Sequence, residues 1–149
     1  MIELVIPGLA RPEAKVQRFN KKRDGSRVPG ARTDKPAQAD WKARVAALAR
    51  QAGVPMLVGP LHLYIEVRVV KPASWPKKPT ASNPWPDVPH KRPDVDNYVK
   101  PIQDALTGIA WPDDSWITRV TAEKVFGAQA EVVVRYSEAA CVAAMEAME

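Results

Sequence analysis

Acidic side chains gather in one short stretch of an otherwise basic chain. Residues 94–114 contain five aspartates and one cation, Lys100, whereas the 149 residues together hold 22 Lys and Arg against 17 Asp and Glu. Residues 11–44 are the most basic part, with eleven Lys and Arg against four acids. Clustered carboxylates bind Mg²⁺, and a basic surface attracts phosphodiesters. A metal-dependent nuclease needs this combination, although solvated surface charge explains it equally well.

The spacing of the acidic residues suits a metal site. Asp94 and Asp96 are two residues apart, so in an extended segment their carboxylates point to the same side, roughly 6–7 Å apart. Lys100 follows Asp96 by four residues, which places it one turn further along the same helix face. Asp113 and Asp114 come after a helix and a turn. A third carboxylate can therefore close the site.

Each of these residues also has a simpler structural explanation. Either aspartate of the 94–96 pair could act only as a helix N-cap. The pair at 113–114 could serve only the chemistry of a turn. Lys100 could be an ordinary surface lysine paired with Asp96 or Asp104. The combination of all of them in a basic chain favours the metal site.

Hydrophobic periodicity predicts the elements that must position these residues. Alternating apolar residues predict strands, and a spacing of three to four predicts helices. The expected order is strand 2–6, helix 36–52, strand 61–70, helix 97–107, and strands 116–126 and 131–136, which we expect to pair as a hairpin around Gly127. This order predicts a single α+β domain over residues 1–136, a mixed β-sheet with packed helices.

Two long segments lack such a pattern. Residues 11–35 are expected to form a basic loop or an irregular hairpin, and residues 71–93, with seven of the 15 prolines, a Pro-rich loop. Residues 137–149 are expected to form a C-terminal helical tail. Trp75 and Trp85 could stack on bases or simply pack their loop. The candidate DNA-binding residues are Arg18, Lys21, Lys22, Arg23, Arg27, Lys77, Lys78, His90, Lys91 and Arg92.

Three motifs carry a family resemblance. They are R-P-D-V-D-N-Y-V-K at residues 92–100, D-A-L-T-G at 104–108 and W-P-D-D at 111–114. Their residue types and spacing closely resemble the RusA family of Holliday junction resolvases. The long, Trp-rich loop at 71–93 and the irregular basic opening depart from the family pattern, and these departures concern the substrate range more than the chemistry.

The resemblance implies a Mg²⁺-dependent endonuclease, with Mn²⁺ as the expected substitute, that acts as a homodimer on four-way DNA junctions in recombination and repair. It also implies that Asp94, Asp96, Asp114 and Lys100 are catalytic and that the three aspartates hold the metal. Asp113 and Asp104 are outer candidates.

Other function classes compete with this hypothesis. One is a non-catalytic nucleic-acid-binding module, and another is a nuclease acting on other branched DNA. A phosphohydrolase of nucleotides is disfavoured, because the chain is basic and lacks a Gly-rich phosphate-binding motif. Apolar runs are too short for a membrane span, the N-terminus lacks signal-peptide features, and the single cysteine, Cys141, allows no internal disulfide. We therefore expect a cytoplasmic protein without a membrane partner.

Overall fold

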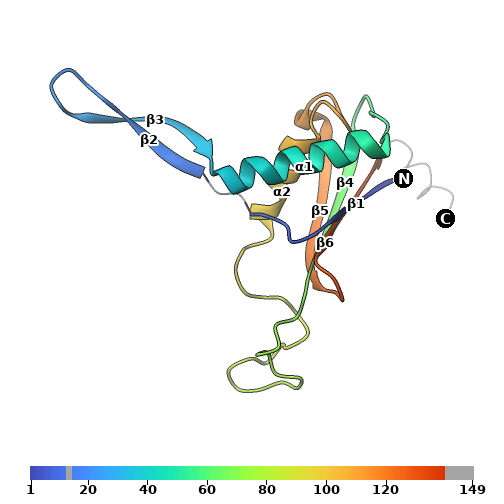
Figure 1. Ribbon diagram of the computed structural model, residues 1–149. Helices are drawn as coiled ribbons and strands as arrows, with labels where there is room; N and C mark the ends of the chain where they lie inside the picture. The colour runs from blue at the N-terminus through green and yellow to red at the C-terminus, as the bar shows by residue number, and fades with distance from the viewer. Residues whose placement is uncertain (13–14, 140–149) are drawn as a thin grey trace.

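A four-stranded sheet forms the body of the protein, and two helices lie on one of its faces (Figure 1). The computed structural model describes residues 1–12 and 15–139. The elements are β1 (Ile2–Pro7), β2 (Lys15–Lys21), β3 (Arg27–Asp34), α1 (Pro36–Ala52), β4 (Leu61–Val69), α2 (Asp96–Leu106), the 3₁₀ helix η1 (Asp114–Trp116), β5 (Ile117–Phe126) and β6 (Glu131–Glu138). The predicted α+β class with a mixed sheet is confirmed.

The sheet has the strand order β1-β6-β4-β5, in which only β4 and β5 run parallel. The predicted hairpin of 116–126 with 131–136 is therefore wrong, because β4 lies between β5 and β6. A parallel pair needs a crossover connection, and here α2 and η1 provide it. Once β5 occupies one edge of β4, β6 pairs with the other. The link between them crosses the end of β4, where the Gly127 N–H donates to the Val69 carbonyl at 2.9 Å.

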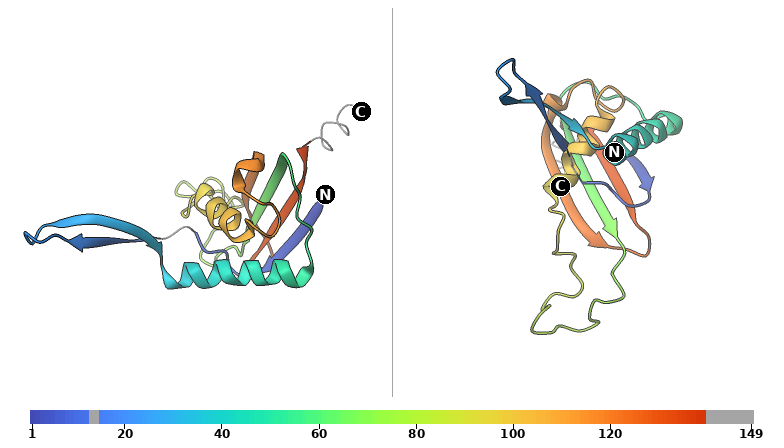
Figure 2. Two further views of the ribbon diagram at one scale, coloured as in Figure 1. Left: turned by 90° about the horizontal axis from the view of Figure 1, so that it is seen from above. Right: turned by 60° about the vertical axis from the view of Figure 1, so that its left-hand side comes forward.

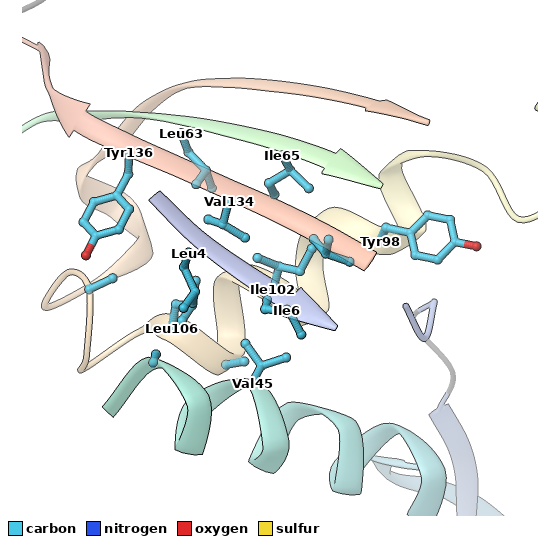
Figure 3. Packing of buried hydrophobic residues seen from close by; sticks show 14 of the residues in the cluster. Leu4, Ile6, Val45, Leu63, Ile65, Tyr98, Ile102, Leu106, Val134 and Tyr136 are labelled. Carbon is cyan, nitrogen blue, oxygen red and sulfur yellow. The ribbon is translucent and has the colours of Figure 1, made fainter. Parts of the chain in front are cut away.

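The core lies between the sheet and the two helices (Figure 3). Along β4 every second residue is buried, as the alternation predicts, and the intervening residues face away from the helices. Trp41, Val45 and Ala49 of α1 meet this face together with Ile102 and Leu106 of α2. Burial of these apolar stripes fixes α2 against the sheet and leaves its polar side outward.

Both predicted helices are present, and only the second is shifted at its ends. Helix α1 covers the predicted range 36–52, with Pro36 in its first turn, and ends at Gly53, whose positive φ of 66° forms a left-handed C-cap. Helix α2 begins at Asp96 and ends at Leu106, one residue earlier at each end than predicted. Pro101 lies in its second turn and is buried.

The predicted basic loop at 11–35 is largely a β-hairpin, the second of the two alternatives. Strands β2 and β3 pair with each other alone and extend away from the body (Figure 1). In the turn that joins them, Gly25 has a φ of 88° and Asp24 Oδ1 accepts the Ser26 N–H at 2.8 Å. A hairpin that covers no core needs no apolar face, so its sequence shows little alternation.

The Pro-rich loop at 71–93 contains no helix or strand, as predicted, and leaves the body in a different direction from the hairpin (Figure 2). It returns to the fold at the start of α2. Most of the predicted tail, residues 140–149, lies outside the described residues, but Ser137 and Glu138 belong to β6 rather than to a helix. Pairing with β4 extends that strand beyond its predicted end. No helix in the described ranges is long and apolar enough to cross a membrane.

Candidate active site at the start of helix α2

The segment that carries Asp94 and Asp96 forms a turn that leads directly into α2. Val95 has helical dihedral angles of −60° and −36°, and the Asn97 N–H donates to the Asp94 carbonyl at 3.1 Å. The expected extended Asp94–Asp96 segment is therefore wrong, because its backbone already closes hydrogen bonds into the helix. No side chain caps α2, so the N-cap explanation fails for both aspartates. Both side chains are exposed.

A lysine from the sheet holds the backbone that enters this turn. Lys124 on β5 donates from Nζ to the carbonyls of Lys91 and Pro93, both at 2.8 Å. These two bonds tie the end of the Pro-rich loop to the sheet immediately before Asp94. Sequence reasoning missed Lys124, because nothing in β5 distinguishes it from other lysines on an exposed strand.

Lys100 connects α2 to the short helix η1. Its Nζ lies 2.8 Å from Asp104 Oδ1 and 3.4 Å from Asp114 Oδ2. The hydrogen bond with Asp104 is the largest cause of the raised pKa of Lys100, and Asp114 adds to it. Lys100 is therefore a cation at neutral pH. An ordinary surface lysine would pair only with Asp96 or Asp104 of its own helix. Lys100 also contacts Asp114, which lies outside that helix.

Asp104 lies between two lysines from different helices. Its Oδ2 is 3.3 Å from Nζ of Lys42 on α1, and its Oδ1 contacts Lys100. Burial raises the pKa of Asp104, but the hydrogen bonds from Lys100 and Lys42 and the charges of these two lysines together outweigh it and leave the pKa below its usual value. Asp104 is thus a fixed anion that orients Lys100. Sequence reasoning gave Lys42 no role.

The two aspartates at 113–114 have different surroundings. Asp113 Oδ1 accepts the Ser115 N–H at 2.8 Å, and this backbone hydrogen bond is the main cause of the lowered pKa of Asp113. Asp113 therefore does serve the turn, while its place as an outer candidate of the site stays a prediction. The Asp114 side chain is 43% exposed and contacts Lys100.

A buried tryptophan anchors the turn that carries these two aspartates. Trp111 is fully buried, donates from Nε1 to Thr107 Oγ1 at 3.2 Å and packs edge-on against Tyr136. Its carbonyl accepts the Gly108 N–H at 2.7 Å, where the φ of 86° suits glycine. The loop from α2 to η1 is therefore a tight, fixed connection.

No preformed metal cluster exists within the described residues, since no three His, Cys, Asp or Glu side chains there are grouped to hold an ion. The exposed carboxylates of Asp94 and Asp96 and the half-exposed carboxylate of Asp114 nevertheless suit Mg²⁺, which prefers oxygen ligands. Mg²⁺ usually keeps several waters and takes one or two protein carboxylates together with substrate phosphates. The donor set therefore fits an ion whose coordination is completed by a DNA phosphate.

Most of the predicted DNA-binding side chains lie on the two projections. Arg18 belongs to β2, while Lys21, Lys22, Arg23 and Arg27 are exposed on the hairpin, Lys77 and Lys78 on the Pro-rich loop, and Lys91 and Arg92 just before Asp94. His90 packs within its loop, with Nε2 3.0 Å from Asn83 Oδ1 and its ring 5.2 Å from that of Trp75.

The two loop tryptophans differ in exposure. Trp75 packs edge-on against Phe126 on β5, with ring centroids 5.3 Å apart, so it does pack its loop onto the body, and its stacking on a base stays a prediction. Trp85 is 64% exposed.

Comparison with known proteins identifies a family and a relative. The family model described as "Endodeoxyribonuclease RusA" matches residues 10–136. A protein of Bacillus subtilis (strain 168) named "Uncharacterized protein YqaN" is 29% identical over 108 residues, which cover 69% of this chain and 76% of that protein. The family match spans both projections and every candidate site residue.

Proposed function

The chain belongs to the RusA family of endodeoxyribonucleases, which resolve Holliday junctions, and from that premise we propose that it cleaves four-way DNA junctions by Mg²⁺-dependent hydrolysis at Asp94, Asp96, Asp114 and Lys100. The observation that carries this proposal is the contact of Lys100 with Asp114. This contact joins α2, which begins within the D-x-D motif Asp94–Asp96, to the second acidic motif at 113–114. Residues that were only surface charges would not need such a contact.

The three aspartates would hold the ion together with the scissile phosphate. Bound Mg²⁺ would supply a Lewis acid for the phosphate and an activated water. Lys100 would neutralise the charge that develops on the phosphate in the transition state, which accelerates the reaction rather than only improving binding. If Asp114 were to ligate the ion, the 2.8 Å contact with Asp104 would still hold the Lys100 ammonium in place.

Histidine has no evident part in this chemistry. His62 lies on the face of β4 that points away from the helices, and His90 packs within the Pro-rich loop. We therefore assign the activation of water to the ion and its carboxylates.

We further propose that the protein acts as a homodimer. A four-way junction has near-two-fold symmetry, and its resolution requires nicks in two strands of like polarity. A C₂ dimer presents two equivalent sites in a matching arrangement. The exposed cations of the hairpin and the Pro-rich loop would then hold the arms of the junction by their phosphates.

Synthetic junctions test the proposed function. Radiolabelled or fluorescent four-way junctions, three-way junctions and linear duplexes of shared sequence are incubated with and without Mg²⁺. We expect paired, symmetric nicks in the four-way junction, only with the metal. Preferential cleavage of another branched substrate would favour the alternative nuclease. Tight binding without cleavage in either Mg²⁺ or Mn²⁺ would favour the binding module.

A further inference from the structure

An apolar groove of about 340 Å³ lies beside the candidate active site. The Pro-rich loop, the ends of β4 and β5, and residues 9–12 enclose it. Its lining includes the rings of Trp75, Tyr98 and Phe126 and the aliphatic side chain of Val70. Nothing in the chemistry proposed above uses these residues.

The groove continues toward Asp94. A second hollow of about 270 Å³ is lined by Pro12, Arg92, Pro93, Asp94 and Asn97. The first three of these residues, Pro12, Arg92 and Pro93, also line the apolar groove. A molecule in the groove would therefore lie next to a group bound at the first aspartate of the D-x-D motif.

The rim of the groove is basic. Arg11, Lys91 and Arg92 line it and are exposed, and no acidic side chain is among the described residues that line it. Lys124 also lines the groove and directs its ammonium to the carbonyls of Lys91 and Pro93. An apolar, aromatic interior with a cationic rim complements a base joined to phosphates, since bases stack on aromatic rings and phosphates pair with cations.

We propose that this groove binds one unstacked nucleobase of the DNA strand whose phosphate enters the candidate active site. The proposal rests on the function proposed above and adds a base-binding subsite to it. The volume lies at the lower end of the roughly 300–1,000 Å³ typical of small-molecule pockets, which suits a single base rather than a base pair. Continuity with the hollow at Asp94 places that base within the nucleotides that flank the cleaved bond.

Trp75 is held in place for this role before DNA binds. Its ring packs against Phe126 and His90, and Lys91 Nζ lies 5.4 Å from the ring centroid. A fixed aromatic ring loses little conformational entropy when a ligand binds. Trp85, in the same loop, is 64% exposed and is not among the residues that line the groove.

The test is a scan with abasic sites. A four-way junction and a single strand of the same sequence carry one abasic nucleotide at each position in turn around the crossover, and binding is measured in EDTA. With the wild-type protein we expect one position at which loss of the base lowers affinity by about 5- to 150-fold, the range expected for base–aromatic stacking. A flat scan on both probes would overturn the proposal.

A matched pair of substitutions assigns the effect to the groove. Val70→Trp fills the groove from an exposed position, 54% accessible. Val88→Trp adds the same bulk at a 51% exposed position of the Pro-rich loop, outside the groove. We expect Val70→Trp to lose affinity for the intact probe and to become insensitive to the abasic site, whereas Val88→Trp retains the wild-type profile. A wild-type profile for Val70→Trp would refute the subsite, and a changed oligomeric state would instead assign the groove to a second copy of the chain.

Cleavage in Mg²⁺ separates the two proposals. If wild-type protein fails to cut junctions but shows the base-dependent binding, the subsite stands and the junction-cleaving function fails. If it cuts junctions and the scan is flat, the function stands and the subsite fails.

Discussion

Lys100 Nζ lies 3.4 Å from Asp114 Oδ2, although fourteen residues, a helix end and a tight turn separate the two along the chain. The same ammonium lies 2.8 Å from Asp104, which in turn contacts Lys42 of α1. One lysine thus joins the acidic motif at the start of α2 to the acidic pair that follows it. Asp104 is itself partly buried and is paired with α1, so it is a fixed partner for that lysine.

Neutralising each proposed metal ligand should abolish cleavage without abolishing binding. We expect Asp94→Asn, Asp96→Asn and Asp114→Asn each to lower the rate of junction cleavage by at least about 100-fold. Affinity for the junction should stay the same or rise, because each substitution removes a negative charge that repels the DNA phosphates. Single-turnover cleavage and gel-shift assays measure the two quantities. Asp40→Asn, at an exposed position of α1, serves as the control, and full activity of any one variant would remove that residue from the site.

Lys100 and its partner Asp104 should differ in the size of their effects. Lys100→Gln should lower the cleavage rate by about 100-fold or more at saturating junction, because the charge acts in the transition state. Asp104→Asn should lower it by only about 10-fold, because Lys100 keeps its charge and loses only its 2.8 Å partner. Thermal unfolding of both variants controls for stability. A wild-type cleavage rate for Lys100→Gln would show that Lys100 is an ordinary surface lysine.

The hairpin cations should act through phosphates alone. Binding should weaken steeply with salt, and the slope of log K against log[salt] should fall by about 0.9 for each phosphate contact that is removed. Lys22→Gln and Arg23→Gln, both at exposed positions of the hairpin turn, test this in fluorescence anisotropy titrations. Arg50→Gln at the end of α1 is the control. An affinity independent of salt would contradict the assignment.

Assembly can be tested by mixing active and inactive subunits. Sedimentation velocity at micromolar concentration should give the mass of a dimer, because two symmetric nicks require two sites. Dimers that combine a wild-type subunit with an Asp114→Asn subunit should nick only one strand of each junction. A strict monomer, both free and bound to a junction, would leave a simple nickase as the better description.

Trp111 should be the tryptophan on which stability depends most. It is fully buried and anchors the loop that carries Asp113 and Asp114. Trp111→Ala should lower the free energy of unfolding by about 3–5 kcal/mol, the usual cost of truncating a buried large aromatic residue. Trp85→Ala, at a 64% exposed position, should change it by less than about 1 kcal/mol. Urea denaturation followed by circular dichroism compares the two variants.

The elements that bury a regular apolar face could be predicted from the sequence. Residues 36–52, 61–69 and 96–106 match their predicted ranges closely, since each repeats its apolar residues with the period of its own backbone. Gly53 and Gly108 follow the ends of the two helices, and both have a positive φ, which glycine adopts without strain. The residue types and spacing of the D-x-D motif were also evident without a structure.

Tertiary structure decided the features that depend on which elements become neighbours. Strands β5 and β6 follow each other in the chain but do not pair, because β4 takes one of them on each edge. Lys42 and Lys124 reach the site across 62 and 31 residues, and no local pattern distinguishes them from other surface lysines. A hydrophobic period reports only which face of an element is buried. The partners of a polar side chain on the opposite face are fixed by the path of the whole chain, and they become known only once the sheet and both helices are in place.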